Sequence, residues 1–223
     1  MINVDAHGER SFLYWRDNAP ARELFQLTTG DDLTRLAQYD WIYFSGITLS
    51  LYNTEGRERL IDLIAAVRRA GSHVAFDGNY RPRGWRDKEA AREAFAAILP
   101  HVDRRCRPFD DEHMLFGDAN AQACADRLRN AGVDEIVVKS GSKGCFILSP
   151  SGSIEVPAES SIKPVDTTAA GDSFNAAYLA ARIRGHNPEE AARAGHRLAG
   201  TVICYPGAII PKEAMPALLS APA

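Results

Sequence analysis

The chain has 223 residues, of which 45% are hydrophobic and 25% are charged, a balance typical of a globular domain. Its formal net charge of −3 argues against a surface for nucleic acid or anionic membrane. The sequence has neither an apolar run of about 18 residues nor a signal-peptide pattern at its N-terminus. Four cysteines without metal-ligand spacing predict reduced thiols in a cytoplasmic protein: Cys106, Cys124, Cys145 and Cys204.

Short apolar runs alternate with helical patterns from residue 41 onward. Three runs predict strands, at 41–46, 73–77 and 135–139. Five helical patterns predict helices at 54–70, 87–99, 119–131, 172–184 and 188–204. A hairpin is expected between them, with strands at 145–148 and 154–156. This order predicts an α/β fold with a doubly wound, mainly parallel sheet and helices on both faces.

The segment VDTTAAGDSFN, residues 165–175, combines a helix start with three very small residues. Because Ala169, Ala170 and Gly171 carry almost no side chain, their backbone N–H groups can approach an anion at the positive end of the helix. Asp172 then has two interpretations. It is either a helix cap or, next to a bound phosphoryl group, the base that accepts a proton from a hydroxyl nucleophile.

Polar segments also follow the expected strands, where ligands bind in open α/β sheets. They are Ser45-Gly46, DGNYRPR at 77–83 and KSGSKG at 139–144. Each of them alone is equally typical of an ordinary turn or loop. Their convergence on one edge of the sheet predicts a ligand site there.

Residues 165–180, VDTTAAGDSFNAAYLA, resemble the C-terminal signature of the ribokinase-like (PfkB-type) carbohydrate kinases, in which the second aspartate is the catalytic base. Three further stretches resemble the branch that phosphorylates 2-keto-3-deoxygluconate (2-dehydro-3-deoxygluconate): GERSFLYWR at 8–16, FDGNYRPRGW at 76–85 and GAIIP at 207–211. The resemblance implies a ribokinase-like fold, ATP and Mg²⁺ as cofactors, and phosphoryl transfer to the terminal hydroxyl of a sugar acid.

Carried over residue by residue, the resemblance assigns Asp172 as the base and Tyr14, Arg16 and Arg81 to the sugar acid. An arginine fork suits the carboxylate of such a substrate. The residues assigned to the nucleotide are Asn79, Lys139, Gly141, Gly144, Ala169, Ala170 and Gly171. Glu112 is assigned an indirect role at the metal.

The chain also departs from the family pattern. Residues 1–18 are expected to be the remnant of a β lid and residues 19–223 the α/β domain, with roughly a quarter to a third of the usual length missing at the N-terminus. We therefore expect little kinase activity from the chain as given. Residues 102–108, VDRRCRP, stand where relatives have a buried apolar strand, and burying arginines is costly. Phe109 replaces the asparagine of the family's Asn-x-x-Glu motif, of which Glu112 remains.

Two alternatives stay open on sequence grounds: another ribokinase-like kinase, such as a fructokinase, and a non-catalytic remnant. A neutral sugar would give Arg16 no carboxylate to bind, so the presence of Arg16 distinguishes a sugar-acid kinase from the first alternative. The expected partners are a sugar acid and ATP, without nucleic acid or membrane, and a homo-oligomer is left open.

Overall fold

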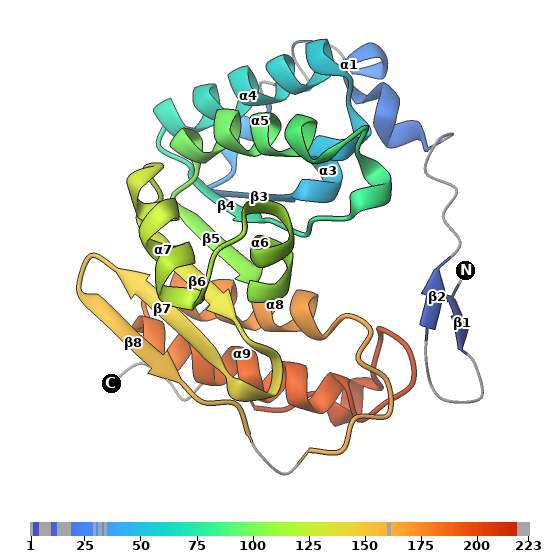
Figure 1. Ribbon diagram of the computed structural model, residues 1–223, viewed down its shortest axis with the longest axis vertical. Coiled ribbons are helices and arrows are strands. Elements are labelled where there is room, and N and C mark those ends of the chain that lie inside the picture. Colours follow the sequence, from blue (N-terminus) through green and yellow to red (C-terminus); the bar gives the residue numbers. More distant parts are fainter. Residues whose placement is uncertain are drawn as a thin grey trace.

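The structure is a computed structural model that describes residues 2–4, 10–12, 19–28, 30, 33, 35–159 and 162–217 (Figure 1). The predictions for Tyr14 and Arg16 lie outside the described residues. Near the N-terminus, β1 (Ile2–Val4) and β2 (Arg10–Phe12) pair antiparallel in a small sheet of their own. The division of the chain into a lid remnant and an α/β domain stays a prediction.

The main sheet has six strands, and their order in the sheet is their order in the chain. They are β3 (Trp41–Ser45), β4 (His73–Asp77), β5 (Arg104–Pro108), β6 (Glu135–Lys139), β7 (Cys145–Ser149) and β8 (Gly152–Val156). The first four strands are parallel, and β7 and β8 add an antiparallel hairpin. The predicted mainly parallel α/β sheet is therefore confirmed, and the carboxyl ends of β3 to β6 meet at one edge.

Helices connect the strands and follow the sheet. They are α1 (Leu24–Leu27), α3 (Gly46–Leu51), α4 (Thr54–Arg69), α5 (Lys88–Ile98), α6 (Phe109–Phe116), α7 (Ala121–Asn130), α8 (Ala170–Ile183) and α9 (Pro188–Val202). Side-chain caps begin several of them, from Asn53, Asp87, Asn120 and Asn187. The sequence did not predict α1, α3 or α6. Among the described residues, no helix is both long enough and apolar enough to cross a membrane.

Helices cover both faces of the sheet, as predicted (Figure 1). On one face, α4, α5 and α7 pack on the strands in a core that includes Ile136 and Val138 of β6. On the other face, α8 and α9 pack in a second core that includes Val137 of the same strand. Because alternate residues of a strand point to opposite faces, β6 contributes to both cores and is buried throughout.

The arginine-rich stretch forms β5 in the interior of the sheet, between β4 and β6. Arg105 and Arg107 are 0% exposed, and both pair with Glu112 of α6, at 2.8 and 3.0 Å. Both guanidinium groups also lie over the ring of Phe95, at 5.3 and 5.1 Å. The expected cost of burial is thus offset by a paired carboxylate and aromatic contacts. It is not abolished, because Nη1 of Arg105 and both terminal nitrogens of Arg107 lack a hydrogen-bond acceptor among the described residues.

Candidate active site

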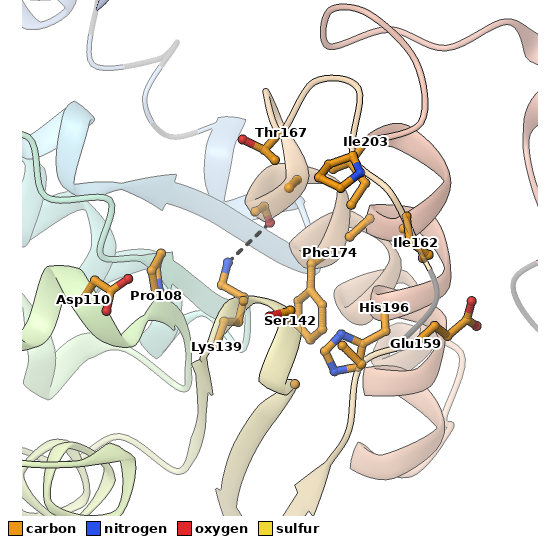
Figure 2. Close-up of a pocket in the computed structure, with 18 residues that line it drawn as sticks. Pro108, Asp110, Lys139, Ser142, Glu159, Ile162, Thr167, Phe174, His196 and Ile203 are labelled. Carbon is orange, nitrogen blue, oxygen red and sulfur yellow. Dashed lines mark hydrogen bonds between the residues drawn. The ribbon is translucent and has the colours of Figure 1, made fainter. Parts of the chain in front are cut away.

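A cavity of about 410 Å³ opens beyond the carboxyl end of β6, where it is bounded by α8 and α9 (Figure 2). Five of the residues assigned to the nucleotide line it: Lys139, Gly141, Gly144, Ala170 and Gly171. Ser142 and Thr167 also line it and belong to segments predicted to lie at the ligand site. The sequence did not predict the remaining lining residues: Pro108, Asp110, Ala158, Glu159, Ile162, Pro164, Phe174, His196, Ala199, Gly200 and Ile203. The cavity lies at the edge where the sequence predicted a ligand site.

One wall of the cavity is the tight turn between β6 and β7. Ser140 N donates to Gly144 O at 2.8 Å, which closes the turn. Gly144 has a φ of 105°, and a side chain there would come within 2.2 Å of the carbonyl oxygen of Val156. Only glycine fits this position, and it brings the turn against β8 with its backbone facing the cavity.

The start of α8 forms another wall. Ala169 precedes the helix in the left-handed conformation, with φ of 59°, and makes no side-chain cap. The helix begins at Ala170, so Asp172 lies inside the first turn and is not the cap, which removes the plainer of its two interpretations. The side chain of Asp172 is exposed, and first-turn N–H groups have no acceptor within their own helix. The arrangement places a carboxylate beside a helix N-terminus, a position that suits an anion.

Asp166 fastens the segment that leads into α8. Its Oδ1 accepts a hydrogen bond from Thr168 N at 2.8 Å, and its Oδ2 accepts one from Gly207 N at 2.9 Å. The backbone N–H groups of Val165 and Asp166 both donate to the carbonyl oxygen of Ile203, at 2.7 and 3.1 Å. The loop before the helix is therefore held by the chain that follows α9.

Lys139 ends β6 beneath the start of α8, and Figure 2 shows its ammonium directed toward that helix. Its Nζ donates to Gly171 O at 3.3 Å and to Asn175 Oδ1 at 2.7 Å. Asn175 Nδ2 in turn donates to Asp77 Oδ2 at 2.9 Å and to Tyr43 Oη at 3.3 Å. A polar chain, buried at Lys139, Asn175 and Asp77, thus joins β3 and the ends of β4 and β6 to the helix that carries Asp172.

The opposite end of the cavity is apolar and lies against α9. The rings of Phe174 and His196 meet edge to face at 5.0 Å, and a ring nitrogen of His196 lies 3.2 Å from Val156 O. Burial lowers the pKa of His196, which favours the neutral ring. A side chain at Gly200 would come within 2.5 Å of Ile162. The small residues in AGHRLAG, 194–200, are a signal that could have indicated a surface that a flat ring can approach, but the sequence analysis did not use it.

Arg81 lies on the β4 side of the sheet edge and does not line the cavity. It is 44% exposed, its Nη1 donates to Tyr80 O at 2.9 Å, and Asp111 lies 3.6 Å away. Asp111 also accepts a hydrogen bond from Tyr80 N at 3.2 Å. Burial raises the pKa of Asp111, although the charges of Arg107 and Arg81 act in the opposite direction. A half-exposed guanidinium held in this way can still receive a second carboxylate.

Asn79 lies between these two regions and also stays outside the cavity lining. It adopts a φ of 23°, and its backbone N–H donates to Asp77 Oδ1 at 3.2 Å. Its side-chain oxygen is buried and has no hydrogen-bond partner among the described residues. A free acceptor at the sheet edge is compatible with a ligand contact, and the nucleotide role of Asn79 stays a prediction.

Glu112 does not face the cavity. It is 0% exposed, and its carboxylate pairs with Arg105, Arg107 and Arg127, at 2.8, 3.0 and 2.7 Å. Burial alone would raise its pKa, but the three arginine charges outweigh burial and hold the pKa below its ordinary value. Asp118 lies near Glu112 but also pairs with Arg127, at 2.6 Å. This geometry does not support the assignment of Glu112 to the metal, because arginines already occupy both of its oxygens.

The chain is similar to carbohydrate kinases along nearly its whole length. The family model for pfkB family carbohydrate kinases matches residues 1–215. The chain is 46% identical to the 2-dehydro-3-deoxygluconokinase of Dickeya dadantii and 43% identical to that of Escherichia coli K12, over 97% of its own length and 71% of theirs. It is 27% identical to a fructokinase of Klebsiella pneumoniae, over 98% of this chain and 69% of that protein.

Among solved structures, Arabidopsis thaliana ribokinase complexed with ribose and ATP matches with a TM-score of 0.71 and 22% identity. The match covers 96% of this chain and 64% of that one, so the chain spans slightly less than two thirds of the solved protein. At this identity, the likeness shows the fold alone. The fold, the cavity at the sheet edge and the family match over residues 1–215 lead to one conclusion: the chain belongs to the PfkB family of carbohydrate kinases.

Proposed function

We propose that this protein transfers the terminal phosphoryl group of ATP to 2-dehydro-3-deoxygluconate (2-keto-3-deoxygluconate), at the terminal hydroxyl of the sugar acid. The observation that carries the proposal is the 46% identity with a curated 2-dehydro-3-deoxygluconokinase over 97% of the chain. The similarity to fructokinases is weaker, at 27% identity. The product is the 6-phospho sugar acid.

The cavity fits a nucleotide in both of its parts. Its apolar end, between α9 and Phe174, suits an aromatic base. Its other end offers the Lys139 ammonium, the turn at Gly141 to Gly144 and the start of α8, which suit a triphosphate. Mg²⁺, when bound with ATP, neutralises phosphate charge. The chain's own residues supply the ammonium and the helix end that face the phosphates.

Asp172 is the base in this proposal. Its carboxylate is exposed next to Gly171, which lines the cavity, so a hydroxyl of a sugar placed between them could pass its proton to Asp172 as it attacks. Arg81, at the same sheet edge, binds the substrate carboxylate as a charge-assisted pair. The cytoplasm is the proposed location, in keeping with four free cysteines.

The test is an assay of ADP release from the purified chain with Mg²⁺ and ATP. The low turnover expected of the chain as given should be measurable with 2-dehydro-3-deoxygluconate, and kcat/KM should be much lower still with D-fructose, which has no carboxylate for Arg81. Detection of the 6-phospho product by mass spectrometry identifies the acceptor hydroxyl. A higher kcat/KM with fructose, or no turnover of the sugar acid while ATP is bound, would contradict the proposal.

A further inference from the structure

Asn175 connects two buried charges of opposite sign at the sheet edge. The amide is 1% exposed, Asp77 is 3% exposed and Lys139 is 9% exposed. The amide accepts from Lys139 Nζ at 2.7 Å and donates to Asp77 Oδ2 at 2.9 Å. Asn175 lies within the signature stretch 165–180 but was given no role there, and it does not line the cavity.

The chemistry of the two charges fixes the orientation of the amide. An ammonium can only donate hydrogen bonds, and a carboxylate can only accept them. The Asn175 oxygen must therefore face Lys139, and its nitrogen must face Asp77. A neutral side chain with one acceptor and two donors thus satisfies both charges while keeping them apart.

The separation of the Lys139 and Asp77 charges matters for the cavity because of where Lys139 lies. Its Nζ also donates to the carbonyl oxygen of Gly171, at 3.3 Å, and the side chain lines the cavity (Figure 2). Without the amide, the Lys139 ammonium and the Asp77 carboxylate would be drawn into a direct ion pair. Such a pair would neutralise the lysine and move it away from the start of α8.

We propose that Asn175 is a positioning residue for phosphoryl transfer, which holds the Lys139 ammonium at the phosphate end of the cavity by engaging Asp77 in its place. The inference rests on the proposed function. Asn175 touches neither substrate nor nucleotide in this scheme. It acts through Lys139, whose charge must face the transferring phosphoryl group to stabilise it.

Other titratable groups surround the amide. Tyr43 of β3 contacts it, Cys106 of β5 and Cys145 of β7 lie on the adjoining strands, and Asp172 lies on the helix that carries it. Burial raises the pKa of Cys106 and that of Cys145 to about 12, so both thiols stay neutral in ordinary buffers. Lys139 and Asp77 are therefore the charges that the amide contacts directly.

The variant Asn175→Asp tests the inference because it keeps the shape of the side chain. Two carboxylates as close as the present amide and Asp77 resist joint ionisation and share one proton, while the Lys139 ammonium, 2.7 Å from the amide oxygen, favours ionisation and lowers the pH at which that proton is lost. The protonated form reproduces the amide, since its O–H donates to Asp77 and its other oxygen accepts from Lys139. Above that pH both carboxylates ionise, repel each other and draw Lys139 away from the cavity.

The kcat of Asn175→Asp should therefore be near that of the unchanged protein at low pH and fall by about tenfold per pH unit once the shared proton is lost. The unchanged protein should show no such fall between about pH 6 and about pH 9. Tyr43→Phe is the matched control. It removes the 3.3 Å contact to the same amide and a 3.5 Å hydrogen bond from Tyr43 Oη to Asp77 Oδ2, but keeps both contacts of Asn175 to Lys139 and Asp77, so its pH profile should match that of the unchanged protein.

A second readout does not depend on turnover of the sugar acid. Binding of ATP and of adenosine is measured by calorimetry for both variants and the unchanged protein across the same pH range. Asn175→Asp should lose ATP affinity with rising pH and keep its adenosine affinity, because only the phosphates face Lys139. A pH-independent ATP affinity in a folded Asn175→Asp variant overturns the inference. If Asn175→Asp does not fold, the affinities for ATP and adenosine are compared in Asn175→Ser instead. An Asn175→Ser variant that prefers ATP over adenosine as strongly as the unchanged protein does would overturn the inference. Failure of the unchanged protein to turn over the sugar acid would count against the proposed function alone.

Discussion

Replacing Glu112 with glutamine should strongly destabilise the protein without changing its packing. Glutamine has the shape of glutamate, so the variant removes the charge and turns one acceptor oxygen into an NH2 donor that faces an arginine. In the structure this charge is fully buried, and it is shared by Arg105 and Arg107 of β5 and Arg127 of α7. Without it, two fully buried guanidinium groups face each other with no carboxylate between them.

The expected magnitude follows from these contacts. Removing one partner from a buried ion pair costs about 3–5 kcal/mol, because the remaining charge stays uncompensated. In a chain of this size each kcal/mol corresponds to about 2–4 °C, so Tm should fall by roughly 6–20 °C. The loss should depend on pH. The pKa of Glu112 is lowered from its ordinary value of 4.5, so its stabilisation is complete above that value and disappears as the pH falls through the lowered pKa.

Thermal unfolding followed by circular dichroism measures the effect at pH 7 and in acid. The matched control is Glu189→Gln, which removes an exposed pair with Arg193 at 2.6 Å on α9 and should change stability by at most about 1 kcal/mol. The difference in Tm between Glu112→Gln and the unchanged protein should narrow as the pH drops below 4.5. If Glu112→Gln and the control variant have the same Tm at pH 7, the argument that this carboxylate compensates the arginines of β5 is refuted.

Three further predictions concern the active site. Asp172→Asn should lower kcat by about 10²- to 10⁴-fold while ATP affinity stays unchanged in calorimetry; near-normal turnover would remove Asp172 as the base. Arg81→Leu should cost about 2–4 kcal/mol in kcat/KM for the sugar acid and much less for a neutral hexose, and equal losses would contradict a carboxylate contact. Gly144→Ala should abolish ATP binding, because the added methyl would lie 2.2 Å from Val156 O, whereas Gly152→Ala, at a positive φ of 119° with open space around it, should affect only Tm. Similar ATP affinities in the two glycine variants would show that the turn tolerates displacement.

The sheet could be predicted from sequence because its strands are short apolar runs between clear helix signals. The strands at His73–Asp77 and Glu135–Lys139 have the predicted bounds. β5 gave no such signal, because its stability depends on pairing with Glu112 of α6 and on aromatic rings of other elements. Local pattern cannot reveal a compensation made between separate elements.

The residues of the candidate site were likewise only partly predictable from the sequence. Gly144, Gly171 and Lys139 follow from motifs whose residues are adjacent in the chain, and all three line the cavity. Asn175 was not identified, because its position three residues after Asp172 reads equally as an ordinary helix interior. His196 was not identified either, since α9 reaches the cavity only through its packing against α8.

Ala169 shows how the fold can prepare the proposed phosphate site before any ligand arrives. Its left-handed φ of 59° would cost glycine nothing, whereas for an L-residue with a side chain it costs about 1 kcal/mol. Glycine would instead raise the entropy of the unfolded chain by a similar amount of free energy, about 0.4–1 kcal/mol. Alanine and glycine at position 169 therefore give nearly equal stability. They differ in the range of backbone conformations open to that residue, which is narrower for alanine than for glycine. A loop restricted in this way loses little freedom when the phosphates bind, so more of the contact energy remains for affinity and orientation.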